Sequence, residues 1–171
     1  MVTEIKSLSV ELSEYDKICV MLAGLLHDVG HGPFSHAFEH VTKHSHEDYT
    51  AKIILGETEL NQVLAEVSPR LPEDIVSIIE HNHPNDILNQ IISGQLDADR
   101  MDYLLRDSYF SATSYGQFDL ERILRTMRVR KIDENKKALV VKYTGIHSVE
   151  DYIMARYQMY WQVYYLSLIH I

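Results

Sequence analysis

The adjacent pair His27-Asp28 is the feature of this chain that most clearly offers chemistry. Imidazole nitrogen and carboxylate oxygen are ligands for divalent metal ions, and histidine also moves protons near neutral pH. The pair ends an apolar run, and His31 and His36 follow shortly after it. Such a cluster behind a buried helix predicts a metal site at the tip of that helix.

The spacing of His27 and His31 also resembles the zinc-binding helix His-Glu-x-x-His of metallopeptidases, with Asp in place of Glu. That motif needs both histidines on one continuous helix, whereas Gly30, Gly32 and Pro33 interrupt the helix here. A loop histidine that only bonds backbone carbonyls is the alternative for any single residue. The density of ligand-type side chains in this segment favours a functional cluster: His27, Asp28, His31 and His36.

The composition is that of a globular protein with a hydrophobic core. The 171 residues are 46% hydrophobic and 24% charged, which are ordinary values. The net charge of -9 argues against nucleic acid as a partner, because an acidic domain lacks the field that attracts a polyanion. Cys19 has no partner for an internal disulfide, and the chain shows neither a membrane-spanning run nor a signal-peptide pattern. We therefore expect a cytoplasmic protein without membrane contact.

A second constellation lies further along the chain. Asp99, Tyr103 and Asp107 are spaced at intervals of four residues, which places them on one face of a helix. A packed helix seldom presents two carboxylates on that face without a partner, and a metal or a hydroxyl donor would supply one. The alternative is a solvated, salt-bridged face. Asp97 and Asp102 are interpreted as capping or pairing residues for neighbouring arginines rather than metal ligands.

Apolar periodicity, caps and breakers predict a mostly α-helical protein. Ser13 and Asp16 predict the start of a helix to about His27, with its apolar residues inward: Ile18, Met21, Leu22, Leu25 and Leu26. Further helices are predicted after Ser35, at 45–56, 72–81, 86–110 with a break near Gly94, 118–127, and from 148 onward. One small β-hairpin is predicted at about residues 128–143. The whole chain, residues 1–171, is predicted to be a single domain.

Two long segments resemble a known family. Leu-Leu-His-Asp-Val-Gly-His-Gly-Pro-Phe-Ser-His at residues 25–36 resembles the signature of the HD-domain metal-dependent phosphohydrolases, and its second half resembles the branch that hydrolyses deoxynucleoside triphosphates. Gln-Leu-Asp-Ala-Asp-Arg-Met-Asp-Tyr-Leu-Leu-Arg-Asp at residues 95–107 resembles the second conserved helix of that branch. The resemblance implies an HD-domain helical bundle with one small β-hairpin.

The resemblance also implies a role for each matching residue. It implies a site for a divalent metal ion (Mn, Fe, Mg, Zn, Ni or Co) held by His27, Asp28 and Asp99. It implies three catalytic or pocket histidines, of which His31 lies near the α-phosphate, His46 donates a proton and His36 lines the pocket. The residues implied for the phosphates and the sugar are Arg100, Tyr103, Asp107, Arg156 and Tyr164.

The implied substrate is a deoxynucleoside triphosphate, split by water at the α-phosphorus into a deoxynucleoside and inorganic triphosphate. Relatives have an upstream histidine that completes the metal shell, and they continue beyond Tyr164, so we expect the domain to be incomplete at both ends. Residues 166–171 are then of uncertain origin.

A homo-oligomer is expected from the family and from the apolar Tyr/Met-rich tail. Two alternatives are an HD phosphohydrolase for another nucleotide phosphate ester and an inactive nucleotide-binding fragment.

Overall fold

The computed structural model describes residue 5 and residues 12–133 and 136–165. The chain divides into two compact units. Leu12–Gly94 form one of them, here called the histidine unit. Met1–Glu11 and Gln95–Ile171 form the other, here called the hairpin unit. The prediction of a mostly α-helical protein with one small hairpin is confirmed. The single-domain organisation stays a prediction.

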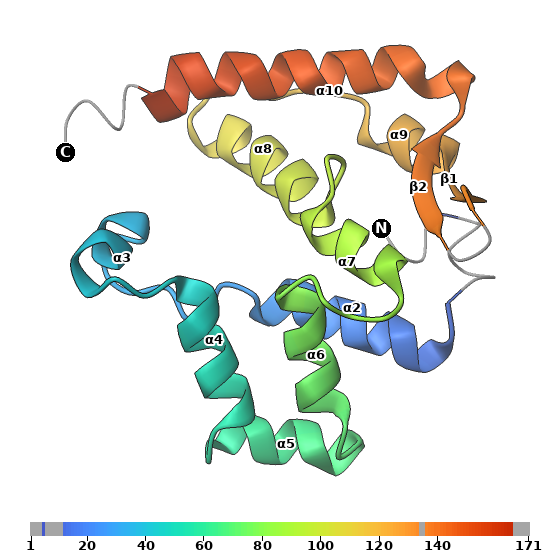
Figure 1. Cartoon of the computed structure of the whole chain (residues 1–171). Helices are drawn as coiled ribbons and strands as arrows, with labels where there is room; N and C mark the ends of the chain where they lie inside the picture. The colour runs from blue at the N-terminus through green and yellow to red at the C-terminus, as the bar shows by residue number, and fades with distance from the viewer. Residues whose placement is uncertain (1–4, 6–11, 134–135, 166–171) are drawn as a thin grey trace. The chain divides into compact units, whose positions relative to one another are not determined.

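The described residues of the histidine unit form helices joined by short turns. They are α2 (Glu14–Leu26), α3 (His36–Thr42), α4 (His46–Leu55), α5 (Glu59–Val67), α6 (Leu71–Ile79) and α7 (Asp86–Ser93). The centre of the unit is α6, which packs against α2, α4, α5 and α7. Its Leu71, Ile75 and Ile78 are completely buried. Figure 1 shows α4 and α6 side by side, with α5 joining their ends.

Local capping explains why two of these helices begin where they do. At Ser13 the side chain accepts from the backbone N–H of Asp16, whose carboxylate accepts from the backbone N–H of Ser13. This capping box is the one predicted from the sequence. The same reciprocal pair, Ser45 and Asp48, starts α4. The second box fixes His46 as the first residue of α4, which decides where its imidazole lies.

The predicted inward face of α2 is wrong for three of its five residues. Leu26 is buried and Leu22 is half-buried, but Ile18, Met21 and Leu25 are 42%, 61% and 72% exposed. The buried residues of α2 are Cys19, Val20, Ala23 and Leu26. Apolar residues surround much of this helix, so their periodicity does not indicate which side is buried. Packing against α6 and α7 determines the buried side.

No element is predicted from the sequence between Gly56 and Pro72, yet α5 (Glu59–Val67) lies there. Thr58 caps this helix by accepting from the backbone N–H of Asn61. Only Leu64 of α5 is buried. A short helix with one buried anchor gives a weak periodic signal, which explains why it is missed.

The hairpin unit combines three α-helices with a two-stranded antiparallel sheet in its described part. Its elements are α8 (Ala98–Phe110), α9 (Leu120–Thr126), β1 (Met127–Lys131), β2 (Lys137–Val141), the 3-10 turn η1 (Tyr143–Gly145), α10 (Ile146–Met159) and the π-helical turn η2 (Tyr160–Tyr164). Met127 pairs with Val141 and Lys131 with Lys137. The strands match the predicted hairpin, except that β1 begins one residue earlier than predicted. The long α10 packs against both α8 and α9 (Figure 1).

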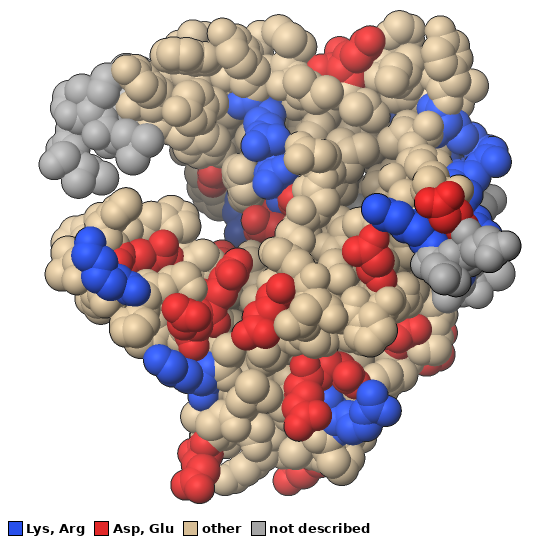
Figure 2. Space-filling view, viewed as in Figure 1, with Lys and Arg blue, Asp and Glu red and all other residues tan. Residues whose placement is uncertain are grey.

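Charge is unevenly distributed between the elements. Figure 2 shows Lys and Arg gathered over the hairpin, where Arg130, Lys131, Lys136 and Lys137 are all exposed. Asp and Glu side chains are scattered over the helices of the histidine unit in the same view. None of the helices in the described part of the chain has the length and apolar composition needed to cross a bilayer.

Candidate functional site

The turn that carries His27 and Asp28 is fastened to α4 by one buried hydroxyl. Thr50, which is fully buried, donates its Oγ1–H to the His27 carbonyl at 2.9 Å and accepts from the Gly30 N–H at 3.0 Å. A Cβ at Gly30 would lie 2.2 Å from the His46 carbonyl oxygen. Only glycine therefore allows the turn to come this close to the start of α4, and the contact holds the turn that carries His27 and Asp28 against this helix.

The tautomer of His27 follows from its backbone contact. Nδ1 lies 2.9 Å from the Gly24 carbonyl oxygen, which can only accept, so Nδ1 carries the proton of the neutral ring. Nε2 then presents its lone pair on the side of Asp28, whose Oδ1 is 3.4 Å away. An imidazole lone pair beside a carboxylate oxygen is a donor set that fits a divalent metal ion.

Two further imidazoles face the same carboxylate. The Nε2 atoms of His31 and His46 lie 3.4 Å and 3.9 Å from Oδ1 of Asp28. The His31 and His46 rings stack with centroids 3.9 Å apart and planes 14° apart. Asp28, His31 and His46 each offer a ligand atom within 4.8 Å of the others. The predicted residues of this segment therefore meet around Asp28, while their catalytic roles stay predictions.

Burial lowers the pKa of the His31 imidazole below its ordinary value, and the neighbouring His46 ring lowers it further. Asp28 acts in the opposite direction but does not outweigh these effects. His31 is therefore favoured in its neutral form, in which one ring nitrogen donates and the other accepts. A neutral ring can contact a phosphate oxygen or a metal without first losing a proton.

Glu39 is a member of the cluster that is not predicted from the sequence. Its Oε1 lies 2.5 Å from Nδ1 of His46 and accepts from the His46 backbone N–H at 3.0 Å. Its Oε2 lies 3.3 Å from Nδ1 of His36. These hydrogen bonds, led by that of the His46 ring, lower the pKa of Glu39 to about 2. The available signal is the spacing of His36 and Glu39, which puts both on one face of a short helix.

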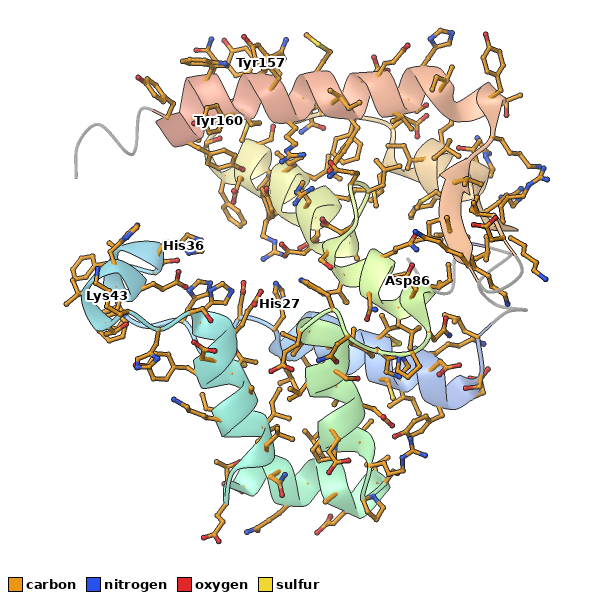
Figure 3. The ribbon with its side chains drawn as sticks, in the orientation of Figure 1. His27, His36, Lys43, Asp86, Tyr157 and Tyr160 are labelled. Carbon is orange, nitrogen blue, oxygen red and sulfur yellow. The ribbon has the colours of Figure 1, made fainter. Side chains whose placement is uncertain are left out.

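His36 begins α3 and is more accessible than the other histidines of the cluster. Its side chain is 71% exposed, against 18% for His46. Figure 3 shows His27 at the end of α2 and His36 at the start of α3. The ring of His36 lies 5.3 Å from that of His31 and 5.6 Å from that of His46. The predicted histidines His31, His36 and His46 thus form one group within the histidine unit.

The hairpin unit brings together residues of the second predicted set. The Tyr164 hydroxyl donates to Oδ2 of Asp107 at 2.7 Å, and the Tyr103 and Tyr164 rings meet edge to face at 6.2 Å. Burial raises the pKa of both phenols, so both are neutral hydrogen-bond donors near pH 7. Tyr164 lies in η2, and a π-helical turn of this kind often marks a functional position.

Arg100 and Arg156 complete the second set. Burial lowers the pKa of the Arg100 guanidinium, but Asp97 and nearby phenols outweigh this effect and raise the pKa above its ordinary value. Arg156 is exposed on α10, and its charge also acts on Tyr103 and Asp97. Both cations act on the Tyr103 phenol, and guanidinium and phenol groups are suited to contact a phosphate and a sugar. The binding roles of the five residues stay predictions.

The acidic residues at the start of α8 divide into structural and exposed positions. Asp97 is buried, caps α8 by accepting from the Arg100 N–H at 2.6 Å, and pairs with the Arg100 guanidinium at 3.4 Å. Asp102 pairs with Arg106 on the next turn. Both capping and pairing interpretations are therefore confirmed. Asp99 is exposed. It belongs to the hairpin unit, while His27 and Asp28 belong to the histidine unit, so the three-residue metal shell stays a prediction.

A helical protein with a His-Asp pair at a helix end, ringed by further imidazoles, is a candidate metal-dependent domain. Residues 3–107 match the family described as HD domain. The chain belongs to the HD-domain family. The match includes both the histidine cluster and α8 through Asp107.

Similar proteins extend this finding. The chain is 54% identical over 155 residues to the uncharacterized protein YwfO of Bacillus subtilis, covering 91% of this chain and 35% of that protein. A crystal structure of a phosphohydrolase from Bacteroides thetaiotaomicron matches with a TM-score of 0.77 and 33% identity, covering 95% of this chain and 38% of that chain. The deoxynucleoside triphosphate triphosphohydrolase SAMHD1 of Danio rerio is 29% identical over 159 residues, covering 73% of this chain and 25% of that protein. The chain thus spans 35%, 38% and 25% of the lengths of these three proteins.

Proposed function

We propose that this chain is part of a metal-dependent phosphohydrolase that converts deoxynucleoside triphosphates into deoxynucleosides and inorganic triphosphate. The observation that carries the proposal is the meeting of Asp28 with three imidazoles, one of which is held by Glu39. This group can bind a metal ion, contact a phosphate and hold a proton in one place. The similarity to a deoxynucleoside triphosphate triphosphohydrolase supports the substrate class.

The residues proposed to hold the metal are His27, Asp28 and Asp99. The tautomer of His27 and its closeness to Asp28 fit a divalent ion such as Mn, Fe, Mg, Zn, Ni or Co. When bound, such an ion supplies Lewis-acid polarisation of the phosphate and makes water a better nucleophile at neutral pH. The Asp28 carboxylate also faces His31 and His46, so both rings lie beside a proposed metal ligand.

His46 is proposed to be the proton donor to the leaving group. Glu39 holds Nδ1 of the ring, so Nε2 is the nitrogen turned toward Asp28 and the reacting groups. Water attacks the α-phosphorus and loses a proton to solvent, the bond from phosphorus to the 5′ oxygen breaks, and that oxygen takes the proton from Nε2. His46 is protonated again from solvent before the next turnover. His31 donates to a phosphate oxygen and offsets the charge that develops there.

The hairpin unit is proposed to bind the rest of the substrate. Arg100 and Arg156 bind phosphate oxygens, while Tyr103, Tyr164 and Asp107 bind the sugar. The Tyr164–Asp107 hydrogen bond and the edge-to-face tyrosine pair restrict the motion of these side chains. A fixed Tyr103 ring beside C2′ would leave no room for a ribose hydroxyl, which accounts for the proposed preference for deoxy sugars. His36 lines the phosphate end of the pocket.

We also propose that the protein forms a homo-oligomer through exposed aromatic side chains at the end of α10 and in η2. Tyr157, Tyr160 and Trp161 are 59%, 49% and 45% exposed, and Figure 3 shows both labelled tyrosines near the end of this helix. Clustered exposed aromatic side chains are typical of interfaces. Light scattering on the full-length protein and on a Tyr157→Ser, Trp161→Ser double variant tests this, because the variant should have the smaller mass.

The experiment for the activity measures triphosphate released from dGTP by the full-length protein with Mn²⁺. The proposal predicts equal amounts of deoxyguanosine and triphosphate, and a loss of at least about 100-fold in Asp28→Asn. The control is Asp86→Asn in the same unit, whose carboxylate is exposed at the start of α7 and bonds only Gln90 in the described interactions. Pyrophosphate or orthophosphate as the product would contradict the proposal.

A further inference from the structure

A second group of metal-ligand side chains lies beside Asp28 and includes neither His27 nor Asp28. His36, Glu39 and His46 each offer a ligand atom, and these atoms lie within 4.8 Å of one another. The two oxygens of Glu39 are shared between the rings, with Oε2 at 3.3 Å from Nδ1 of His36 and Oε1 at 2.5 Å from Nδ1 of His46. The carboxylate therefore lies between two imidazoles that both turn Nδ1 toward it.

Two imidazoles and one carboxylate are a common protein donor set for zinc. Zn–N and Zn–O bonds of about 2.0–2.1 Å in a tetrahedral site separate the ligand atoms by about 3.3 Å. The His36–Glu39 separation of 3.3 Å already matches this spacing. The His46–Glu39 separation of 2.5 Å must lengthen by less than 1 Å to reach the same spacing.

The position of the group allows an ion to enter from solvent. The His36 side chain is 71% exposed, while Glu39 and His46 are 25% and 18% exposed. The ligands come from two neighbouring helices, since His36 and Glu39 lie on α3 and His46 starts α4. The less exposed pair is already held together by the bond from the His46 backbone N–H to Glu39, so small side-chain shifts are enough to bring the three ligand atoms around an ion.

We propose that His36, Glu39 and His46 form a second transition-metal site, which takes Zn²⁺ and thereby inhibits the enzyme. The ion replaces the proton between Glu39 and Nδ1 of His46, and that proton leaves to solvent. Zinc on Nδ1 occupies the nitrogen that Glu39 holds, so it breaks the Glu39–His46 pair on which the proposed proton donor depends. The binding of zinc stands on the geometry of this group, while the inhibition rests on the proposed function.

The first experiment measures metal binding without any substrate. Co²⁺ serves as a coloured substitute for zinc, and its visible absorption and the Zn²⁺ binding isotherm are recorded for the full-length protein. In an Asp28→Asn background, which impairs the other site, we expect one remaining equivalent with a tetrahedral Co²⁺ spectrum. Adding His36→Ala should weaken this binding at least tenfold. The matched control is His44→Ala, an exposed neighbouring histidine paired only with Asp48 and Tyr49 in the described contacts.

Equal binding by the His36→Ala and His44→Ala proteins would overturn the site, whatever the enzyme hydrolyses. The second experiment adds Zn²⁺ to the Mn²⁺-activated protein and compares each variant with its own rate without zinc. We expect His36→Ala to need at least tenfold more zinc for half inhibition than His44→Ala. Equal zinc sensitivity would overturn the inhibitory role. An enzyme that releases a product other than triphosphate would contradict the proposed function but would leave the binding result intact.

Discussion

The Nδ1 atom of His46 lies 2.5 Å from Oε1 of Glu39, and the His46 backbone N–H donates to the same oxygen at 3.0 Å. One carboxylate oxygen therefore fixes both the ring and the start of its helix. We predict that Glu39→Gln lowers kcat about 100-fold while KM changes little, because the ring of the proposed proton donor loses the carboxylate that holds its Nδ1. Steady-state kinetics on dGTP measure both constants.

The control for this prediction is Glu47→Gln, which changes a carboxylate in the first turn of α4. Thermal unfolding of both variants separates a folding defect from a defect in proton transfer. If Glu39→Gln keeps the wild-type kcat, His46 is not the proton donor in the arrangement described.

Gly30→Ala should destabilise the protein by about 3 kcal/mol, the upper end for forcing extra volume into a packed site. The new Cβ would meet the His46 carbonyl oxygen at 2.2 Å and the Thr50 nitrogen at 2.4 Å, and backbone atoms cannot move aside cheaply. Gly24→Ala is the matched change, since its Cβ would meet only the end of the Ile92 side chain at 3.4 Å. It should be neutral or stabilising by up to about 1 kcal/mol in mid-helix. Urea unfolding compares the two, and similar losses would contradict the packing described.

Tyr103→Ala should reduce the discrimination between deoxyribose and ribose substrates about tenfold or more, because it removes the ring proposed to exclude the 2′ hydroxyl. The measurement is the ratio of kcat/KM for dGTP and GTP. Tyr109→Ala is the control, since Tyr109 is on the same helix but 76% exposed. An unchanged ratio in Tyr103→Ala would show that another residue selects the sugar.

Tyr15 gives a pH-dependent contribution to stability that is independent of the catalytic cluster. Its hydroxyl donates to Oδ2 of Asp74 at 2.7 Å, joining α2 to α6. Burial and then this hydrogen bond raise the pKa of Tyr15 from 10.0 to about 12. A raised pKa in the folded state means that the stabilisation is complete below pH 10 and is lost as pH rises through about 12.

Tyr15→Phe should therefore lower the free energy of unfolding by about 1 kcal/mol at pH 7, the typical net contribution of a hydrogen bond. The difference between wild type and variant should shrink between pH 10 and pH 12, because only the wild type can ionise here. Urea unfolding at pH 7 and pH 11 measures both differences. A difference in the free energy of unfolding between wild type and variant that grows with rising pH would contradict this prediction.

Most element boundaries could be predicted because they depend on local chemistry. The capping box at Ser13 and the break at Gly94 involve residues only a few positions apart. The strand pairing likewise falls within the predicted hairpin because turn and strands are neighbours in sequence. Local rules of this kind are visible in one sequence without knowledge of tertiary packing.

The features that could not be predicted from the sequence are those determined by tertiary contacts. Apolar residues nearly surround α2, so the sequence could not show that Ile18 and Met21 are exposed while Cys19 and Val20 are buried. The role of Glu39 depends on a turn that returns the chain to His46, and no local pattern specifies that meeting. Composition and spacing could identify histidines able to act, but not the carboxylate that fixes one of them.

The most direct test of the proposed reaction follows the oxygen of water. The full-length protein would hydrolyse dGTP in water enriched in ¹⁸O, and mass spectrometry would locate the label in the products. Attack at the α-phosphorus predicts one ¹⁸O atom in inorganic triphosphate and none in deoxyguanosine. Label in deoxyguanosine, or in released orthophosphate or pyrophosphate with no labelled triphosphate, would contradict the account.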